Sequence, residues 1–503
     1  MNTALVRKSI LALVFFFLVV CATVAQEKSF TILHTNDIHA SFIPHEATWI
    51  RSEPKPMIGG FAELSWMIDS IRKAKSTAIL LDAGDVMTGT PVSDIVYDGA
   101  SGGALFAMMN MMGYDAWTIG NHDLDISQDN LRRLTSIATF PTVSANLTDS
   151  AGAFTLNNKP YLILKKNGIT FGIIGIMSRE LFSLTNTKNL KGLKVSSPVE
   201  VTQKYIDEIT PQSDVVLALT HEGTDEDSIL AVSTHGLNII IGGHSHTRLE
   251  HPKFINGVII CQTGANCENL GELDVTIDHH HVTKYDGELH HLWIHHEAAS
   301  KEIADLITDM KNKIDQDYNQ VIGTLVSDWK RGGGESNLGD FIADAMRESE
   351  NADVGITNSS GIRKDLSAGP IRKLDLSEIL PFRNYLCTFP MTGRELKKLA
   401  MDHARSLTHG RSSLQISGLA CTYKQSGDSI EIKSLKAGGE DVDDAKSYTV
   451  ATSDFLINQA DKYLGMTPAQ TTMSDKLMFD AMVEKVLKEK NIDSKIEHRF
   501  KDE

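Results

Sequence analysis

The chain is poor in cysteine, proline and aromatic residues for its length. Its 503 residues include 5 Cys, 13 Pro and 37 Gly, and aromatic side chains make up 7%. So little cysteine excludes a disulfide-rich scaffold, and so little proline and glycine excludes collagen-like and low-complexity chains. With 41% hydrophobic residues, the composition is that of a globular protein of roughly two or three domains, each long enough to bury a core.

The chain also has fewer basic than acidic side chains, 49 Lys and Arg against 65 Asp and Glu, which gives a formal net charge of −16. An acidic chain repels nucleic-acid phosphates and anionic lipids, so we exclude a general binder of nucleic-acid polymers. If the protein handles small phosphate compounds, the positive charge must come from local arginines or from bound metal ions.

Long hydrophobic runs are missing beyond the N-terminus. Arg7 and Lys8 precede an uncharged apolar stretch that closes on the small-residue segment Ala22–Ala25. This order is typical of a secretory signal peptide, and the stretch is short for a membrane span, although a retained anchor remains the alternative. We therefore predict a signal peptide over residues 1–25 and an exported mature protein, located in the periplasm, at the cell surface or in the medium. No integral membrane span is expected after cleavage.

Four cysteines remain after the predicted signal peptide, at positions 261, 267, 387 and 421. They form neither a CxxC pair nor a zinc-finger spacing, and four cysteines are too few to frame a chain of this size. We do not expect cysteine to carry the chemistry.

From about residue 30 to residue 273, short apolar runs alternate with amphipathic stretches such as Phe61–Lys75. Buried strands alternating with helices predict an α/β layered domain. The apolar runs expected to form strands are Phe30–Leu33, Ala78–Leu81, Ala116–Ile119, Thr142–Ser144, Phe171–Met177, Val215–Leu219, Leu237–Ile241 and Val258–Ile260.

The pattern changes after residue 270. Gly271–His296 is predicted to form a hairpin that turns at Asp286-Gly287, and its many histidines are expected to be solvated. Lys301–Tyr318 is predicted to be a helix with a sparse apolar stripe, suited to connecting two domains. The sequence therefore predicts a first domain over residues 26–300, a linker helix over 301–320 and a second, smaller α/β domain over 321–503.

Polar motifs follow five of the predicted strands directly. Because ligands bind beyond the carboxyl ends of strands in open α/β sheets, we expect these motifs to converge on one site. Alone, each motif would fit an ordinary turn or cap; together and in this order they favour a functional site. The motifs are Asp37-Ile38-His39, Asp82-Ala83-Gly84-Asp85, Gly120-Asn121-His122-Asp123, His221-Glu222 and Gly242-Gly243-His244-Ser245-His246.

The residue types predict what this site binds. Carboxylate, amide and imidazole ligands suit Zn²⁺, Mn²⁺ or Fe²⁺ better than Mg²⁺ or Ca²⁺. The candidates outnumber the ligands of one tetrahedral ion, which favours two divalent ions with a shared carboxylate, an arrangement that activates water for phosphoester displacement. The seven candidate ligands are Asp37, His39, Asp85, Asn121, His221, His244 and His246.

In this order the motifs resemble those of the calcineurin-like metallophosphoesterases and, more narrowly, of the secreted 5′-nucleotidase / UDP-sugar hydrolase family. The resemblance implies a layered metallophosphoesterase sandwich followed by a substrate-specificity domain. It also implies that Asp85 bridges two ions. One ion would be held by Asp37, His39, Asp85 and His246, and the other by Asp85, Asn121, His221 and His244. Well-known members of this branch have Gln or Asn at the position of His246.

His122 is expected to have a catalytic role. If Asn121 binds metal, the neighbouring His122 can face the phosphate and, when protonated, stabilise charge that develops in the transition state. Asp125 lies three positions later and can orient that imidazole, as the family resemblance also implies. A structural histidine is the alternative. No serine or cysteine nucleophile motif competes, so direct attack by metal-activated water is the simplest mechanism.

The second domain contains three segments that resemble the substrate-binding segments of this family. Two aromatic faces can sandwich a nucleobase and an arginine can bind phosphate oxygens, although ordinary core packing is the alternative for either phenylalanine. The segments are Asn358-Ser359-Ser360-Gly361-Ile362-Arg363, Leu380-Pro381-Phe382 and Ser453–Asp461. The resemblance implies contacts to the base from Asn358, Phe382 and Phe455, to the phosphate from Arg363 and to the ribose from Asp461, with Arg331 as a further candidate.

These features together predict an enzyme that hydrolyses nucleoside 5′-monophosphates such as AMP to nucleoside and phosphate, with UDP-sugar hydrolysis as a further activity. A 2′,3′-cyclic-nucleotide phosphodiesterase/3′-nucleotidase is the closest alternative, although Asp125 departs from the pattern of that branch. A non-catalytic surface-binding protein is a weaker alternative, because the candidate ligands and His122 are all present.

Overall fold

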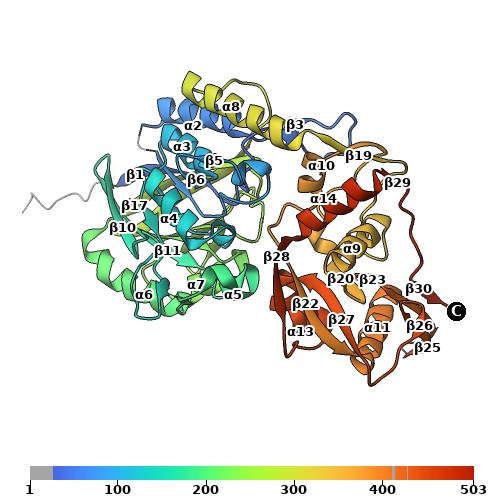
Figure 1. Ribbon diagram of the computed structural model, residues 1–503. Helices are drawn as coiled ribbons and strands as arrows, with labels where there is room; N and C mark the ends of the chain where they lie inside the picture. The colour runs from blue at the N-terminus through green and yellow to red at the C-terminus, as the bar shows by residue number, and fades with distance from the viewer. Residues whose placement is uncertain (1–26, 77, 410–413, 428) are drawn as a thin grey trace, which may run out of the picture.

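The computed structural model describes residues 27–76, 78–409, 414–427 and 429–503. The predicted signal peptide lies outside the described residues. The chain folds into an N-terminal and a C-terminal domain, with the long helix α8 (Lys301–Tyr318) leading from the first to the second (Figure 1). Within the described part of the chain, no helix is both long and apolar enough to cross a bilayer.

The first sheet of the N-terminal domain has six strands in the order β18-β17-β1-β4-β7-β8. Its central strands run parallel, and the last two in sequence form an antiparallel hairpin at one edge. The strands are β1 (Lys28–Thr35), β4 (Ile79–Asp82), β7 (Ala116–Thr118), β8 (Thr142–Val143), β17 (Asn269–Asp278) and β18 (His281–His291).

The second sheet also has six strands, in the order β10-β11-β13-β14-β16-β15. Each predicted apolar run overlaps a strand of one of these two sheets, so the predicted strands are confirmed. The strands are β10 (Tyr161–Lys166), β11 (Ile169–Met177), β13 (Val215–His221), β14 (Ile239–Gly242), β15 (Lys253–Ile255) and β16 (Val258–Cys261).

The two sheets pack face to face through an apolar layer, in which Phe30 meets the edge of Phe171 with ring centroids 4.9 Å apart. Both faces of the central strands are covered, which is why these strands, unlike the exposed edge strand β18, are largely apolar along their length. The outer faces are covered by α2 (Phe61–Ala74), α3 (Gly103–Met112), α4 (Gln128–Ile137), α6 (Pro198–Ile209) and α7 (Thr224–Ser233). The loops of this domain form three short two-stranded sheets: β2 (His45–Glu46) with β3 (Met57–Ile58), β5 (Val96–Tyr97) with β6 (Ala100–Ser101), and β9 (Leu147–Asp149) with β12 (Leu193–Val195).

The predicted hairpin forms, but the predicted turn is wrong. The chain turns at His279 and His280, both with positive φ (47° and 64°), whereas Asp286-Gly287 lies inside β18, with Gly287 paired to Leu273. A Cβ at Gly287 would lie 2.5 Å from the ring of Pro252. This glycine therefore serves close packing within a strand and not a turn.

Helix α8 has the predicted bounds. The side chain of Ser300 caps its N-terminus by accepting a hydrogen bond from Ile303 N. The helix buries Ile303, Met310 and Ile314 of the predicted stripe against the N-terminal domain.

The C-terminal domain is built on a five-stranded sheet in the order β23-β20-β27-β22-β28. Two smaller sheets and several helices pack around it, forming two apolar cores. The central strands are β20 (Val354–Asn358), β22 (Tyr385–Thr392), β23 (Leu414–Ser417), β27 (Ser447–Ser453) and β28 (Thr472–Leu477). The smaller sheets contain β19 (Val321–Leu325), β21 (Gly369–Arg372) and β29 (Asn491–Ile492), and β24 (Leu419–Ser426), β25 (Ser429–Ala437), β26 (Glu440–Asp441) and β30 (Phe500–Asp502). The helices are α9 (Asn337–Ser349), α10 (Lys373–Ile379), α11 (Gly393–Thr408), α12 (Asp454–Asn458), α13 (Ala460–Leu464) and α14 (Met478–Glu489).

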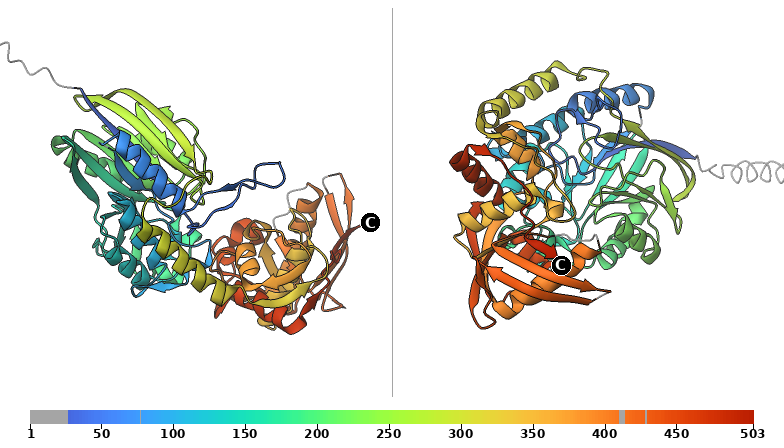
Figure 2. Two further views of the ribbon diagram at one scale, coloured as in Figure 1. Left: turned by 90° about the horizontal axis from the view of Figure 1, so that it is seen from above. Right: turned by 90° about the vertical axis from the view of Figure 1, so that its right-hand side faces the viewer.

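The two domains meet through loops and short helices (Figure 2). Helix α12 of the C-terminal domain packs against α5 (Leu181–Leu184) of the N-terminal domain. An ion pair between Arg383 and Asp94 crosses the same boundary. These contacts place the carboxyl ends of the N-terminal strands opposite the C-terminal domain.

Candidate metal centre and active site

The polar motifs converge at the carboxyl ends of the N-terminal strands, as expected from the sequence. Asp37 follows β1, Asp85 follows β4, Asn121 follows β7 and His221 ends β13. Six of the candidates form two groups whose ligand atoms lie within 4.8 Å of one another. The groups are Asp37, His39 and His246, and Asp85, His221 and His244.

In the first group, acceptor atoms point at one another. His246 Nε2 lies 3.4 Å from Asp37 Oδ1 and 2.9 Å from His39 Nε2. His39 Nδ1 donates to the carbonyl of Thr88 at 3.0 Å, which leaves a lone pair on Nε2. Among the described residues, Asp37 Oδ1 has no hydrogen-bond partner, although Oδ2 accepts from Asn36 Nδ2 and His244 N. Converging lone pairs of this kind suit a cation.

The second group has a similar arrangement. His221 Nε2 lies 3.0 Å from Asp85 Oδ2, while its Nδ1 donates to the carbonyl of Ala83 at 2.7 Å. The side-chain oxygen of Asn121 is buried and has no hydrogen-bond partner in the described part of the chain. Two buried oxygens without donors, Asn121 Oδ1 here and Asp37 Oδ1 in the first group, are therefore available as metal ligands.

The electrostatics favour the metal-binding forms of His39, His244 and Asp85 but the protonated form of His221. Burial lowers the pKa of His39 to about 4 and, helped by the charge of His221, lowers that of His244 to about 4, so both imidazoles are neutral. Burial also lowers the pKa of His221, but the negative charge of Asp85 outweighs it and raises the pKa to about 10. The charges of His221 and His122 outweigh burial at Asp85 and hold its pKa well below the usual range.

The backbone of this centre is unusual. Five of the seven candidate ligands have left-handed φ: Asp37 (49°), His39 (49°), Asp85 (57°), His244 (80°) and His246 (52°). Non-glycine residues rarely adopt this conformation, and those that do cluster at functional sites. Gly120 completes the packing, since a Cβ there would lie 2.1 Å from Asp85 Oδ1.

His122 and Asp125 form the predicted pair. His122 Nδ1 lies 2.6 Å from Asp125 Oδ2, on the short 3₁₀ helix η2 (His122–Leu124) that follows β7. Burial lowers the pKa of His122, but the charges of Asp125 and Asp85 outweigh it and raise the pKa to about 9. The imidazole is therefore protonated at neutral pH.

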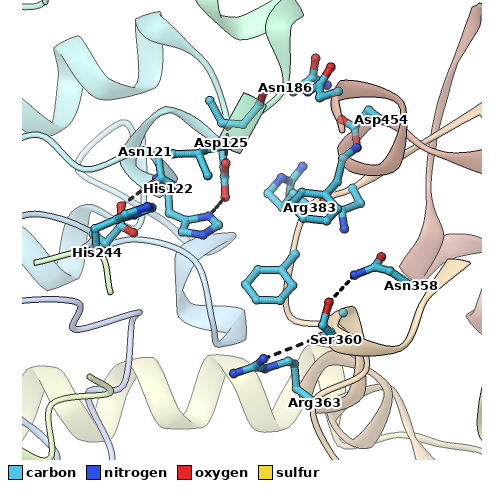
Figure 3. Close-up of a pocket in the computed structure, with 18 of the residues that line it drawn as sticks. Asn121, His122, Asp125, Asn186, His244, Asn358, Ser360, Arg363, Arg383 and Asp454 are labelled. Carbon is cyan, nitrogen blue, oxygen red and sulfur yellow. Dashed lines mark hydrogen bonds and ion pairs between the residues drawn. The ribbon is translucent and has the colours of Figure 1, made fainter. Parts of the chain in front are cut away.

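A cavity of about 290 Å³ lies between the two domains. Figure 3 shows His122, Asp125, Asn121 and His244 on one side, facing residues of the C-terminal domain on the other. Candidate residues of both domains line it: Asp85, Asn121, His122, Asp125, His244, His246, Asn358, Arg363, Phe382 and Phe455.

Comparison with known proteins agrees with this arrangement. The family described as "Calcineurin-like phosphoesterase" matches residues 30–248, and the one described as "5'-nucleotidase, C-terminal domain" matches residues 314–467. The chain belongs to the 5′-nucleotidase family of metallophosphoesterases. As a member of this family it is a metal-dependent phosphoester hydrolase.

The relatives of this metallophosphoesterase differ in length. It is 29% identical to "Trifunctional nucleotide phosphoesterase protein YfkN" of Bacillus subtilis, covering 87% of this chain but only 32% of YfkN. It is 26% identical to "Protein UshA" of Escherichia coli, covering 87% of both chains. Among solved structures, a 5′-nucleotidase precursor from Thermus thermophilus has a TM-score of 0.75 at 24% identity, covering 94% of this chain and 99% of that one. At that identity the likeness shows the fold alone.

Phe382 contacts two other candidate residues, in addition to its predicted role of stacking on a base. Its ring lies nearly parallel to the imidazole of His122, with centroids 5.5 Å apart and an interplanar angle of 19°. The central guanidinium carbon of Arg363 lies 5.9 Å from the centroid of the same ring. Phe382 thus joins the phosphoesterase centre to the specificity domain.

Two residues proposed from the resemblance lie outside the cavity. Asp461 is exposed and accepts a hydrogen bond from Thr467 Oγ1 at 2.6 Å. Arg331 does not line the cavity either, but donates to the carbonyl of Arg363 at 2.7 Å. The structure thus places Arg331 against the backbone of the candidate Arg363 and leaves Asp461 apart from the other candidates.

Sequence reasoning missed several residues that line the cavity or build its walls. Arg383, Asn384 and Asp454 line it without having been predicted to do so. Asp123 accepts hydrogen bonds from the backbone N–H groups of Asp85 and Gly120, so it supports the loops and belongs to neither group of candidate ligands. Asp123 belongs to a recognised motif, but nothing in the sequence separates a ligand from a carboxylate that supports the loop.

Proposed function

We propose that the protein hydrolyses nucleoside 5′-monophosphates to nucleoside and phosphate, and that UDP-sugars are further substrates. The single observation that supports this most is the cavity, because it joins the phosphoesterase centre of one domain to base- and phosphate-binding side chains of the other. The name of one relative, a nucleotide phosphoesterase, and the matched 5′-nucleotidase C-terminal domain point the same way.

We further propose two divalent ions, Zn²⁺, Mn²⁺ or similar, with Asp85 shared between them. The unpartnered oxygens of Asp37 and Asn121 and the neutral imidazoles fit such ions. When bound, the ions supply Lewis acidity and an activated water for displacement at phosphorus. The proposed ligand sets are Asp37, His39, Asp85 and His246, and Asp85, Asn121, His221 and His244.

The chain's own residues have separate roles in this proposal. His122, held protonated by Asp125, donates a hydrogen bond to a phosphoryl oxygen and stabilises the charge that develops there. Arg363 binds the phosphate from the opposite side of the cavity. Asn358 contacts the base, and Phe382 and Phe455 stack on it. Asp461, which is exposed and accepts a hydrogen bond from Thr467 in this structure, is kept as the proposed ribose contact on the strength of the family resemblance.

We propose the same domain division as the sequence predicts, with a signal peptide over residues 1–25, a catalytic domain over 26–300, a linker helix over 301–320 and a specificity domain over 321–503. Export to the periplasm, the cell surface or the medium follows from the signal peptide. Mass spectrometry of the exported protein tests this directly, and a chain that still carries residues 1–25 would contradict it.

The function is tested by measuring phosphate release from AMP, 3′-AMP, 2′,3′-cyclic AMP and UDP-glucose, each with and without a chelator; the UDP-glucose and cyclic AMP reactions are coupled to an excess phosphomonoesterase. We expect chelator-sensitive turnover of AMP, with UDP-glucose as a second substrate. Preference for the cyclic or 3′ substrate would instead support the alternative of a 2′,3′-cyclic phosphodiesterase/3′-nucleotidase. Chelator-resistant turnover would contradict the metal assignment.

A further inference from the structure

Thr88 connects the two halves of the phosphoesterase centre. Its backbone carbonyl accepts the hydrogen bond from His39 Nδ1 at 3.0 Å, and its hydroxyl donates to Asp125 Oδ2 at 2.9 Å. The residue is 2% exposed and adopts a left-handed φ of 64°. A β-branched residue in this conformation is a strained outlier, so the loop around it must over-determine its position.

Thr185 approaches the same carboxylate from the other side. Its hydroxyl donates to Asp125 Oδ1 at 2.6 Å, and it is 6% exposed. Its backbone carbonyl accepts a hydrogen bond from Asn458 Nδ2, at the end of helix α12 in the C-terminal domain, at 3.2 Å. Each oxygen of Asp125 therefore accepts a hydrogen bond from a different threonine.

These two contacts restrict the rotation of the Asp125 carboxylate about its last side-chain bond. The terminal torsion of an aspartate is broad, so a single hydrogen bond to His122 leaves the plane of the carboxylate free to turn. Two hydroxyls, one on each oxygen, fix that plane, and the plane in turn fixes the direction of the imidazole (Figure 3 shows the His122–Asp125 contact). Partners that orient catalytic or metal-binding groups in this way have large effects without touching substrate.

We propose that Thr88 and Thr185 are positioning residues that hold the carboxylate of Asp125, and through it the imidazole of His122, in the orientation that meets the phosphate. Thr88 also sets the distance between this pair and His39, because one residue bonds both. The proposal rests on the proposed function for the role of His122, but the placement of the imidazole can be measured without turnover.

The test compares Thr88→Val and Thr185→Val, which keep the shape and remove the hydroxyl, with Thr88→Ser and Thr185→Ser, which keep the hydroxyl. Ser183→Ala is the matched control, because that hydroxyl donates locally, to the carbonyl of Glu180 just before its own helix. kcat and KM are measured for AMP and for p-nitrophenyl phosphate, alongside metal content and thermal unfolding.

We expect each valine variant to lose roughly 10–100-fold in kcat on both substrates, with KM and metal content unchanged. Each serine variant should restore most of the loss, and Ser183→Ala should match the wild type. Metal content should survive in Thr88→Val because His39 is held by the backbone carbonyl and not by the side chain.

A second readout does not depend on activity. In protein labelled with nitrogen-15 at histidine, the Nδ1–H resonance of His122 is identified by its loss in His122→Asn. We expect it to shift or broaden in both valine variants and to stay in place in Ser183→Ala. Unchanged kcat and an unchanged resonance in the valine variants would overturn the proposal, as would a loss of metal and stability that serine does not rescue. If the wild type fails to hydrolyse AMP, the proposed function fails, while the resonance still tests the positioning.

Discussion

Replacing Phe382 or Phe455 with alanine should have different effects, because the two rings line the same cavity but have different partners. Both rings line it, but only Phe382 has a ring partner in the catalytic domain, the imidazole of His122 at 5.5 Å. The ring partner of Phe455 is Tyr463 of its own domain, at 6.2 Å. The two substitutions should therefore differ in which substrates they affect.

The expected magnitudes follow from these contacts. Loss of base stacking costs about 1–3 kcal/mol, or roughly five- to 150-fold in kcat/KM for AMP, for either variant. p-Nitrophenyl phosphate has no nucleobase to sandwich, so Phe455→Ala should leave its kcat/KM nearly unchanged. Phe382→Ala also removes an aromatic contact worth about 0.5–1.5 kcal/mol from His122, which predicts a further two- to tenfold loss, approximately, on the aryl phosphate.

The assay measures kcat/KM for both substrates on the same folded, metal-loaded preparations. Thermal unfolding and metal content of each variant exclude a general loss of structure. The reasoning is refuted if Phe455→Ala lowers aryl phosphate turnover as much as AMP turnover, or if Phe382→Ala leaves the aryl phosphate untouched.

Further predictions concern the centre and the core. Asp85→Asn and His122→Asn should both abolish turnover, the latter by about 10²–10⁴-fold, but metal analysis should show loss of ions only in Asp85→Asn; equal loss in both would contradict the assigned roles. Burial raises the pKa of Asp227 to about 7, so the folded protein keeps a proton that the unfolded chain releases near pH 4, approximately, and stability falls as pH rises through this window. The stability advantage of Asp227→Asn over wild type, from urea unfolding, should accordingly grow between about pH 4 and 7 and then level off; a constant difference would argue against the shifted pKa. Phe171→Ala should cost about 3–5 kcal/mol in the same assay, whereas Phe254→Ala, 54% exposed, should change stability by less than about 0.5 kcal/mol.

The sequence predicted the sheets and the convergence of the candidate ligands because the signals are local. A buried parallel strand is apolar along its length, and a ligand such as Asp37 or Asp85 follows its strand within a few residues. The convergence of these residues then follows from the topology of parallel strands. The strand pattern, the positions of the motifs and the fold class are therefore mutually consistent in the sequence alone.

The features that escaped prediction depend on contacts distant in sequence. Thr88 and Thr185 meet at one carboxylate although they lie far apart along the chain, and neither belongs to a motif. Asp286-Gly287 has the composition of a turn, but packing of Gly287 against Pro252 overrode that local preference. Side-chain partners and close backbone approaches of this kind are decided by tertiary packing, which spacing along the chain does not encode.

The left-handed backbone conformation of the candidate ligands lowers folding stability at the positions that the proposed metal binding requires. Such a conformation costs a non-glycine residue about 1–2 kcal/mol, and five of the seven candidate ligands adopt it. Glycine at any of these positions would relieve the backbone while removing a ligand. Selection of random variants for heat resistance alone, without metal, would therefore enrich substitutions that dismantle the centre, so a thermostable form of this enzyme has to be selected in the presence of ions and substrate.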